Sequence, residues 1–84
     1  HLNFWRTSSQ IEVDFILSDH TAVEVKAKEN IATQDLKPLF ALAEERKLKR
    51  YLCVSLERRR RKLDSVVVLP WKEFLDELWN GRYR

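Results

Sequence analysis

Two short segments of alternating apolar and polar residues place the strongest constraint on how this 84-residue chain can fold. Residues 11–17 and 21–28 each carry apolar side chains at about every second position, which is typical of a β-strand whose two faces meet different surroundings. The three residues between them, 18–20, read Ser-Asp-His and suit a tight turn. The pattern therefore predicts an antiparallel hairpin over residues 11–28.

The length of the loop fixes the register of this hairpin. With three loop residues, Phe15 faces Val23, and one step further from the loop Asp14 faces Glu24. A loop of two residues would place the two apolar sets on opposite faces of the sheet, which conflicts with burying one face. The three-residue register also puts Lys26, two positions after Glu24, on the same face as both carboxylates.

The rest of the chain predicts a small α/β domain. The expected elements are a strand at 4–7, a helix from about 35 to 47, strands at 51–56 and 66–69, and a final helix that opens at Pro70 and stops at Gly81. The predicted order is β-β-β-α-β-β-α, with a mixed sheet flanked by helices and strand 51–56 near its centre. Trp71 and Trp79 fall on one face of the last helix, and we expect them to pack in the core.

Length and composition limit what the chain can be. Eighty-four residues, 44% of them hydrophobic, fit one domain spanning residues 1–84. We expect this domain to be a piece of a longer protein, since it contains no methionine, and to be cytoplasmic, since no apolar run reaches a membrane-spanning length and no secretory signal opens the chain. The single cysteine, Cys53, excludes an internal disulfide and a cysteine zinc cluster, and we expect it to be buried.

The opposed carboxylates of Asp14 and Glu24 are the candidate site. Directly opposed like charges repel, and a divalent cation such as Mg²⁺ or Mn²⁺, which prefers oxygen ligands, would compensate them. Lys26 on the same face would orient a water or offset charge on a phosphate, a combination that suits phosphodiester hydrolysis. The alternative is a solvent-facing sheet on which Glu12 and Lys26 form an ordinary cross-strand ion pair.

The positive charge of the chain is concentrated in one segment. Residues 46–62 carry nine basic side chains and one acidic side chain. A run of five of them lies between two predicted strands and suits contact with a phosphate backbone: Arg58, Arg59, Arg60, Arg61 and Lys62. A solubilising loop or a docking surface for an acidic ATPase partner explains the same run equally well.

Three stretches of the sequence carry a family resemblance: Glu12–Leu17, Ala22–Ala27 and Val67–Leu75. They resemble the C-terminal domain of unknown function found in many prokaryotic AAA-type ATPases, a domain that looks like a nuclease of the PD-(D/E)XK superfamily. The resemblance spans nearly the whole chain. It implies a restriction-endonuclease-like core at the C-terminus of a larger ATPase, with the ATPase domain of that parent chain as a partner.

The resemblance also implies roles for individual residues. Asp14, Glu24 and Lys26 match the catalytic signature, and Asp14, Glu24 and the backbone carbonyl of Val25 match the ligands of Mg²⁺ or Mn²⁺. The leading hypothesis is therefore a metal-dependent nuclease domain, or its remnant, that acts on nucleic acid. The alternatives are a module of the same fold that binds nucleic acid without cutting it, and an appendage that docks a partner protein.

Overall fold

The computed structural model describes residues 4–5, as backbone, and residues 13–84. In this part of the chain six strands form one sheet in the order β1-β2-β3-β4-β6-β5. The strands are β1 (Phe4–Trp5), β2 (Phe15–Leu17), β3 (Thr21–Val25), β4 (Arg50–Ser55), β5 (Arg61–Leu63) and β6 (Val66–Pro70), and the helices are the 3₁₀ turn η1 (Thr33–Leu36), α1 (Lys37–Glu45) and α2 (Trp71–Trp79). The predicted α/β class and mixed sheet are confirmed, and β4 lies at the centre as expected.

The predicted element order is wrong by one strand, β5, which lies inside the basic run. Arg61 and Lys62 belong to this edge strand, which pairs antiparallel with β6 through a tight turn in which Asp64 has a φ of 54°. The sequence of β5 does not alternate between apolar and polar residues, so the pattern does not predict this strand. An edge strand can form with a single apolar position, here the half-buried Leu63. Charged side chains on such an edge also discourage pairing with another chain.

The register predicted for the first hairpin is confirmed where the structure describes it. Phe15 lies opposite Val23, and the three-residue loop turns through Ser18 and Asp19, whose φ angles of 52° and 64° are left-handed. Aspartate tolerates this conformation better than most residues, which explains its place in the loop. The predicted pairing of Glu12 with Lys26 lies outside the described residues.

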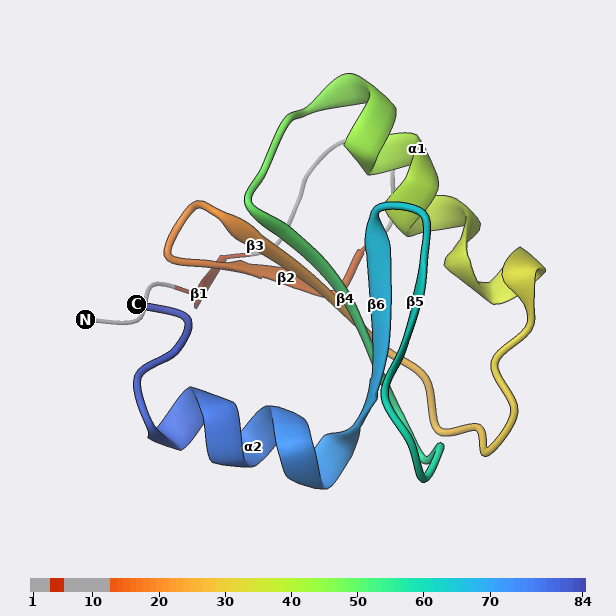
Figure 1. Cartoon of the computed structure of the whole chain (residues 1–84). Coiled ribbons are helices and arrows are strands. Elements are labelled where there is room, and N and C mark those ends of the chain that lie inside the picture. Colours follow the sequence, from red (N-terminus) through yellow and green to blue (C-terminus); the bar gives the residue numbers. More distant parts are fainter. Residues whose placement is uncertain (1–3, 6–12) are drawn as a thin grey trace.

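The two helices cover opposite faces of the sheet (Figure 1). β3, β4 and β6 run parallel, and α1 is the crossover from β3 to β4.

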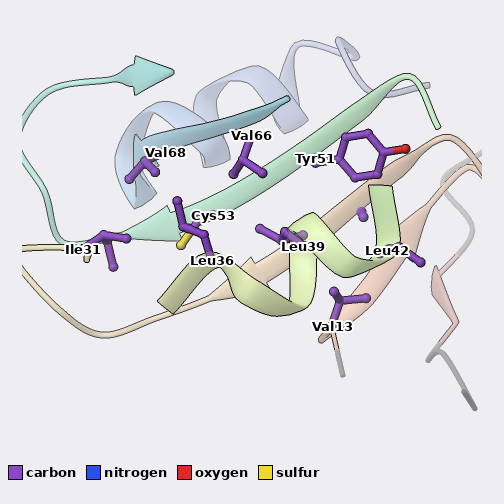
Figure 2. Packing of buried hydrophobic residues seen from close by; sticks show 10 residues of the cluster. Val13, Ile31, Leu36, Leu39, Leu42, Tyr51, Cys53, Val66 and Val68 are labelled. Atoms are coloured by element: carbon purple, nitrogen blue, oxygen red, sulfur yellow. The ribbon is translucent and has the colours of Figure 1, made fainter. Parts of the chain in front are cut away.

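Figure 2 shows the core beneath α1, where Leu36, Leu39 and Leu42 face Tyr51, Cys53, Val66 and Val68. The prediction of a single buried face for the hairpin is wrong for β3, because Thr21, Ala22, Val23 and Glu24 are all buried. Neither α-helix in the described residues is long and apolar enough to cross a membrane.

The expectation that both tryptophans of α2 pack in the core is wrong. Phe74 occupies the inward face, where its ring stacks on that of the buried Tyr83 with centroids 5.6 Å apart. The chain folds back to bring Tyr83 there through Gly81, which has a φ of 79°. With the inward face filled in this way, Trp71 is 44% exposed and Trp79 is 88% exposed.

Candidate active site

The candidate site lies where β3 ends. Glu24 and Val25 are the last two residues of this strand, and Lys26 follows it directly. Because β3, β4 and β6 are parallel, the segments that follow them leave the sheet on the same side, as Figure 1 shows. This side is the edge formed by the carboxyl ends of the three strands. Residues far apart in the sequence are therefore brought to the same edge, which is where α/β sheets commonly carry their sites.

Asp14 reaches this edge from the other strand of the hairpin. Its backbone N–H donates to the carbonyl of Val23 at 3.1 Å, and its carboxylate oxygen Oδ2 accepts the N–H of Val25 at 2.6 Å. The predicted cross-strand pair of Asp14 with Glu24 is thus replaced by a side-chain cap, because the regular pairing of β2 begins only at Phe15. Asp14 remains exposed, and its charge still acts on Glu24.

Glu24 is a buried carboxylate beside a lysine. The residue is only 7% exposed, and its Oε2 lies 3.7 Å from Nζ of Lys26. Burial and the nearby Asp14 carboxylate raise the pKa of Glu24, and Lys26 offsets part of this effect. The predicted lysine is therefore in contact with the predicted acid, and its own side chain is 35% exposed, which leaves it within reach of a ligand.

The backbone carbonyl of Val25 is directed towards the same place. The N–H of Lys26 donates to Val54 of β4 at 2.9 Å. A trans peptide holds that N–H and the Val25 carbonyl on opposite sides, and the described residues contain no cis peptide. The carbonyl of Val25 therefore faces away from β4, on the side where Asp14 accepts the Val25 N–H.

The donor set at this point consists of oxygen atoms: two carboxylates and one carbonyl. Such a set fits Mg²⁺ or Mn²⁺, which commonly take one or two protein carboxylates and complete their shell with water and phosphate. In the part of the chain that the structure describes, no group of three or more histidine, cysteine, aspartate or glutamate side chains could hold a metal ion. A cation here would rely on Asp14, Glu24 and the carbonyl of Val25.

Two further charged residues adjoin the site and were not predicted. Nζ of Lys28 donates to Oδ2 of Asp35 at 2.7 Å, and the same oxygen accepts the N–H of Ala32 at 2.9 Å. The hydrogen bond from Lys28 is the main cause of the lowered pKa of Asp35. The charge of Lys26 also lowers this pKa. Asp35 lies at the third position of η1, but the N-cap residue is Ala32, so the sequence does not show the usual capping signature that would have revealed it.

Part of the predicted basic run is engaged within the molecule. Arg61 binds the carboxylate of Glu57, with Nη2 to Oε2 at 2.8 Å, and donates to the carbonyl of Ile31 at 2.6 Å. Arg60 pairs with Glu73, at 3.4 Å, and with Glu77. Ile31, in the segment after β3, accepts from Arg61 and donates its N–H to Oε2 of Glu57 at 2.6 Å, so the basic run adjoins the edge that carries Glu24.

The remaining members of the basic run are free to contact a ligand. Arg58, Arg59 and Lys62 are exposed, and among the described residues no carboxylate is paired with any of them. Arg58 and Arg59 follow Leu56, whose N–H donates to the carbonyl of Lys28 at 2.9 Å. The phosphate-contacting role predicted for these residues stays a prediction.

Cys53 lies next to Glu24 in the sheet and is confirmed as buried. It is the partner of Glu24 in the β3–β4 pairing and is fully inaccessible. Burial, with the Glu24 carboxylate nearby, raises the pKa of the thiol to about 12. The thiol therefore stays protonated at neutral pH and does not act as a nucleophile.

Glu24→Gln is expected to stabilise the fold at neutral pH. A raised pKa means that the folded state binds a proton more tightly than the unfolded chain, so the ionised Glu24 costs stability above its ordinary pKa of 4.5. The melting temperature of the variant should therefore exceed that of the native chain at about pH 7, and the difference should shrink as the pH falls and the native Glu24 takes up its proton.

The exposed Glu44→Gln provides the matched control, because it removes the same charge from the surface of α1. It should leave the melting temperature nearly unchanged across this range. Both curves should still fall in acid, since the pKa values of Asp35, Glu57 and Glu77 are lowered and their stabilising contribution is lost on protonation. A lower melting temperature for Glu24→Gln at neutral pH would contradict the prediction.

Comparison with known proteins places the chain in a family. A family model described as a domain of unknown function, DUF4143, matches residues 1–74. No curated protein and no solved structure matches the chain. The match covers the hairpin with Asp14 and Glu24, the basic run and the start of α2. The chain belongs to the DUF4143 family, a domain of unknown function.

Proposed function

We propose that this chain is a metal-dependent phosphodiesterase domain that acts on nucleic acid, with a restriction-endonuclease-like core of the PD-(D/E)XK type. One observation carries the proposal. At the end of β3 the buried carboxylate of Glu24 lies beside Lys26 and within the field of Asp14, whose carboxylate accepts the N–H of Val25. Burying one carboxylate next to another is costly unless a cation compensates them, and this is the arrangement that a divalent metal site requires.

Each residue has a role in this proposal. Asp14 and Glu24 hold a divalent cation together with the carbonyl of Val25. When bound, the cation lowers the pKa of a water nucleophile and offsets the charge that develops on the phosphoryl oxygens. Lys26 donates to a non-bridging phosphate oxygen, for which its partial exposure and its position 3.7 Å from Glu24 suit it.

The exposed members of the basic run supply the contact with the substrate backbone. Arg58 and Arg59 follow β4 at the sheet edge where β3 ends, so a strand of nucleic acid lying on the candidate site would also meet their guanidinium groups. These contacts release counterions, and the affinity should fall steeply as salt is added. By its resemblance to ATPase-linked domains, we propose that the chain acts as an appendage of an AAA-type ATPase in the cytoplasm.

A titration with Mn²⁺ and with Mg²⁺, followed by calorimetry, tests the site. The native chain should bind one divalent cation, while Asp14→Asn and Glu24→Gln should each weaken binding by about tenfold or more because each removes a charged ligand. Binding should also weaken in acid, since the cation competes with the proton on Glu24. Glu44→Gln, which removes an exposed charge on α1, should bind like the native chain.

Cleavage of plasmid DNA and of single-stranded RNA, with and without the cation, then tests the reaction. Cation-dependent cleavage that is lost in Asp14→Asn supports the proposal. Salt-sensitive binding of nucleic acid without cleavage at any cation concentration would overturn the hydrolytic function and favour the binding module, which the exposed Arg58 and Arg59 already suit. Absence of both cation and nucleic-acid binding would overturn both.

A further inference from the structure

The outer face of α2 carries an apolar stripe with no covering segment among the described residues. Trp71, Leu75 and Trp79 follow one another at intervals of four residues and are 44%, 49% and 88% exposed. Their spacing puts them on one side of the helix, with Lys72 and Asp76 along its margin. An exposed row of two tryptophans and a leucine at helical spacing is the kind of surface that other proteins bury against a partner.

The stripe borders an open groove. Its walls come from α2 and the C-terminal residue: Lys72, Leu75, Asp76, Leu78, Trp79 and Arg84. The lining of the groove is mainly apolar and includes charged residues of both signs. A partner that fills it must therefore offer an apolar side chain flanked by an acid and a base.

We propose that a second copy of this chain occupies the groove, with the two α2 helices antiparallel about a two-fold axis at Leu75. The stripe is symmetric about this residue, because Trp71 and Trp79 are each four positions away, or about 6 Å along the helix. The two-fold operation therefore superposes one apolar row on the other in reversed order. A surface that meets itself in this way is the requirement for an isologous dimer.

The charges at the margin are complementary under the same operation. Lys72 lies three residues before Leu75 and Asp76 lies one residue after it, on the same side of the helix as Lys72. In the antiparallel pair, Lys72 of each copy comes to within about 3 Å, measured along the axis, of Asp76 of the other copy. Because Asp76 lies one residue from the two-fold axis, the two Asp76 residues come equally near each other along the helix axis, and the two lysines that flank them offset this repulsion. Each dimer therefore forms two equivalent ion pairs across the interface.

The apolar residues are matched as well. On the opposite margin, Trp71 of one copy meets Leu78 of the other, because these residues lie at nearly equal distances from Leu75 in opposite directions. Lys72, whose Nζ lies 5.7 Å from the centroid of the Trp71 ring, is already placed at the rim of the stripe. A partner with charges of one sign only would repel either Lys72 or Asp76. A second copy instead offers an opposite charge to each of them. This dimer does not depend on the proposed hydrolytic function.

Charge reversal followed by mixing tests the proposal. Sedimentation velocity over a concentration series should show a monomer–dimer equilibrium for the native chain. Lys72→Asp places two acids opposite each other in the dimer, and Asp76→Lys places two bases, so each variant alone should dimerise roughly tenfold more weakly or worse. An equimolar mixture of the two variants should regain dimerisation, because each copy of one then faces the opposite charges of the other.

The mixing experiment distinguishes repulsion between the two copies from repulsion between residues 72 and 76 of the same helix. Lys72 and Asp76 are also four residues apart on the same helix, but repulsion inside a variant helix cannot be relieved by adding the other variant. Trp79→Ala should weaken the native dimer by about tenfold or more, and Lys47→Asp, an equal charge change after the end of α1, should leave it unchanged. Circular dichroism confirms that each variant is folded. A native chain that stays monomeric, or variants whose mixture does not associate, would overturn the proposal.

Discussion

Lys26→Ala is expected to slow cation-dependent phosphodiester cleavage by about a hundredfold to a thousandfold while the site still binds its cation. The ammonium of Lys26 lies 3.7 Å from the Glu24 carboxylate and is partly exposed, so it is placed to meet charge that develops on a phosphate. Removing a preorganised donor of this kind lowers the rate far more than it lowers the affinity for the ground state. The loss should therefore appear in kcat and not in KM.

The measurement is a single-turnover cleavage assay beside a Mn²⁺ titration of the same variant. Because Lys26 holds down the pKa of Glu24, its removal should also shift the acid limb of Mn²⁺ binding to higher pH. Lys47→Ala, a matched loss of one exposed lysine after the end of α1, should cleave at the native rate. Loss of Mn²⁺ binding at every pH in Lys26→Ala, or an unchanged cleavage rate, would assign Lys26 a structural role.

The sequence was sufficient to predict the hairpin and its register. The apolar positions of residues 11–17 and 21–28, joined by a three-residue loop, allow one pairing that keeps them together, and Phe15 indeed faces Val23. The apolar runs that became β4 and β6 were equally clear, because strands covered on both faces contain few polar positions. In β4 and β6 the local pattern and the tertiary burial agree, and agreement of this kind makes prediction succeed.

The sequence was sufficient to name the candidate residues, but not to predict the contacts that their side chains make. The sequence places Asp14 and Glu24 near each other, but it cannot show that Asp14 caps the N–H of Val25, or that Glu24 is buried under α1. These contacts depend on where β2 stops pairing and on the packing of a helix far along the chain. The ion pair of Lys28 with Asp35 was missed for the same reason, since it joins two segments whose spacing follows no periodic pattern.

The tryptophans of α2 show where periodicity misleads. Trp71, Phe74, Leu75, Leu78 and Trp79 make an apolar arc too wide for a helix of nine residues to bury against one sheet face. The part of the arc that turns inward is the one that carries Phe74, on which Tyr83 stacks after the chain folds back through Gly81. No local rule predicts that contact, and it is what leaves the tryptophan stripe outside.

Leu39→Ala is expected to destabilise the fold by about 2 to 5 kcal/mol, the largest stability loss that we predict. Leu39 is fully buried and extends from α1 into the core drawn in Figure 2, where it lies among Leu36, Tyr51 and Cys53. Truncation removes apolar contacts and leaves a cavity that a close-packed core fills only in part. Small domains have a total stability of about 5 to 15 kcal/mol, so this one substitution should remove a large fraction of the free energy of unfolding.

Urea denaturation followed by circular dichroism measures the loss, with Leu56→Ala as the matched control. Leu56 is 43% exposed beyond the end of β4, so the same truncation there removes little buried surface and should change the free energy of unfolding by about 0.5 kcal/mol or less. An equal loss for both variants would mean that leucine truncation acts through the unfolded chain and not through the core. A large loss for Leu39→Ala alone ties the stability of the candidate site to α1, because the helix that carries Leu39 and covers Cys53 also covers the face from which Glu24 extends.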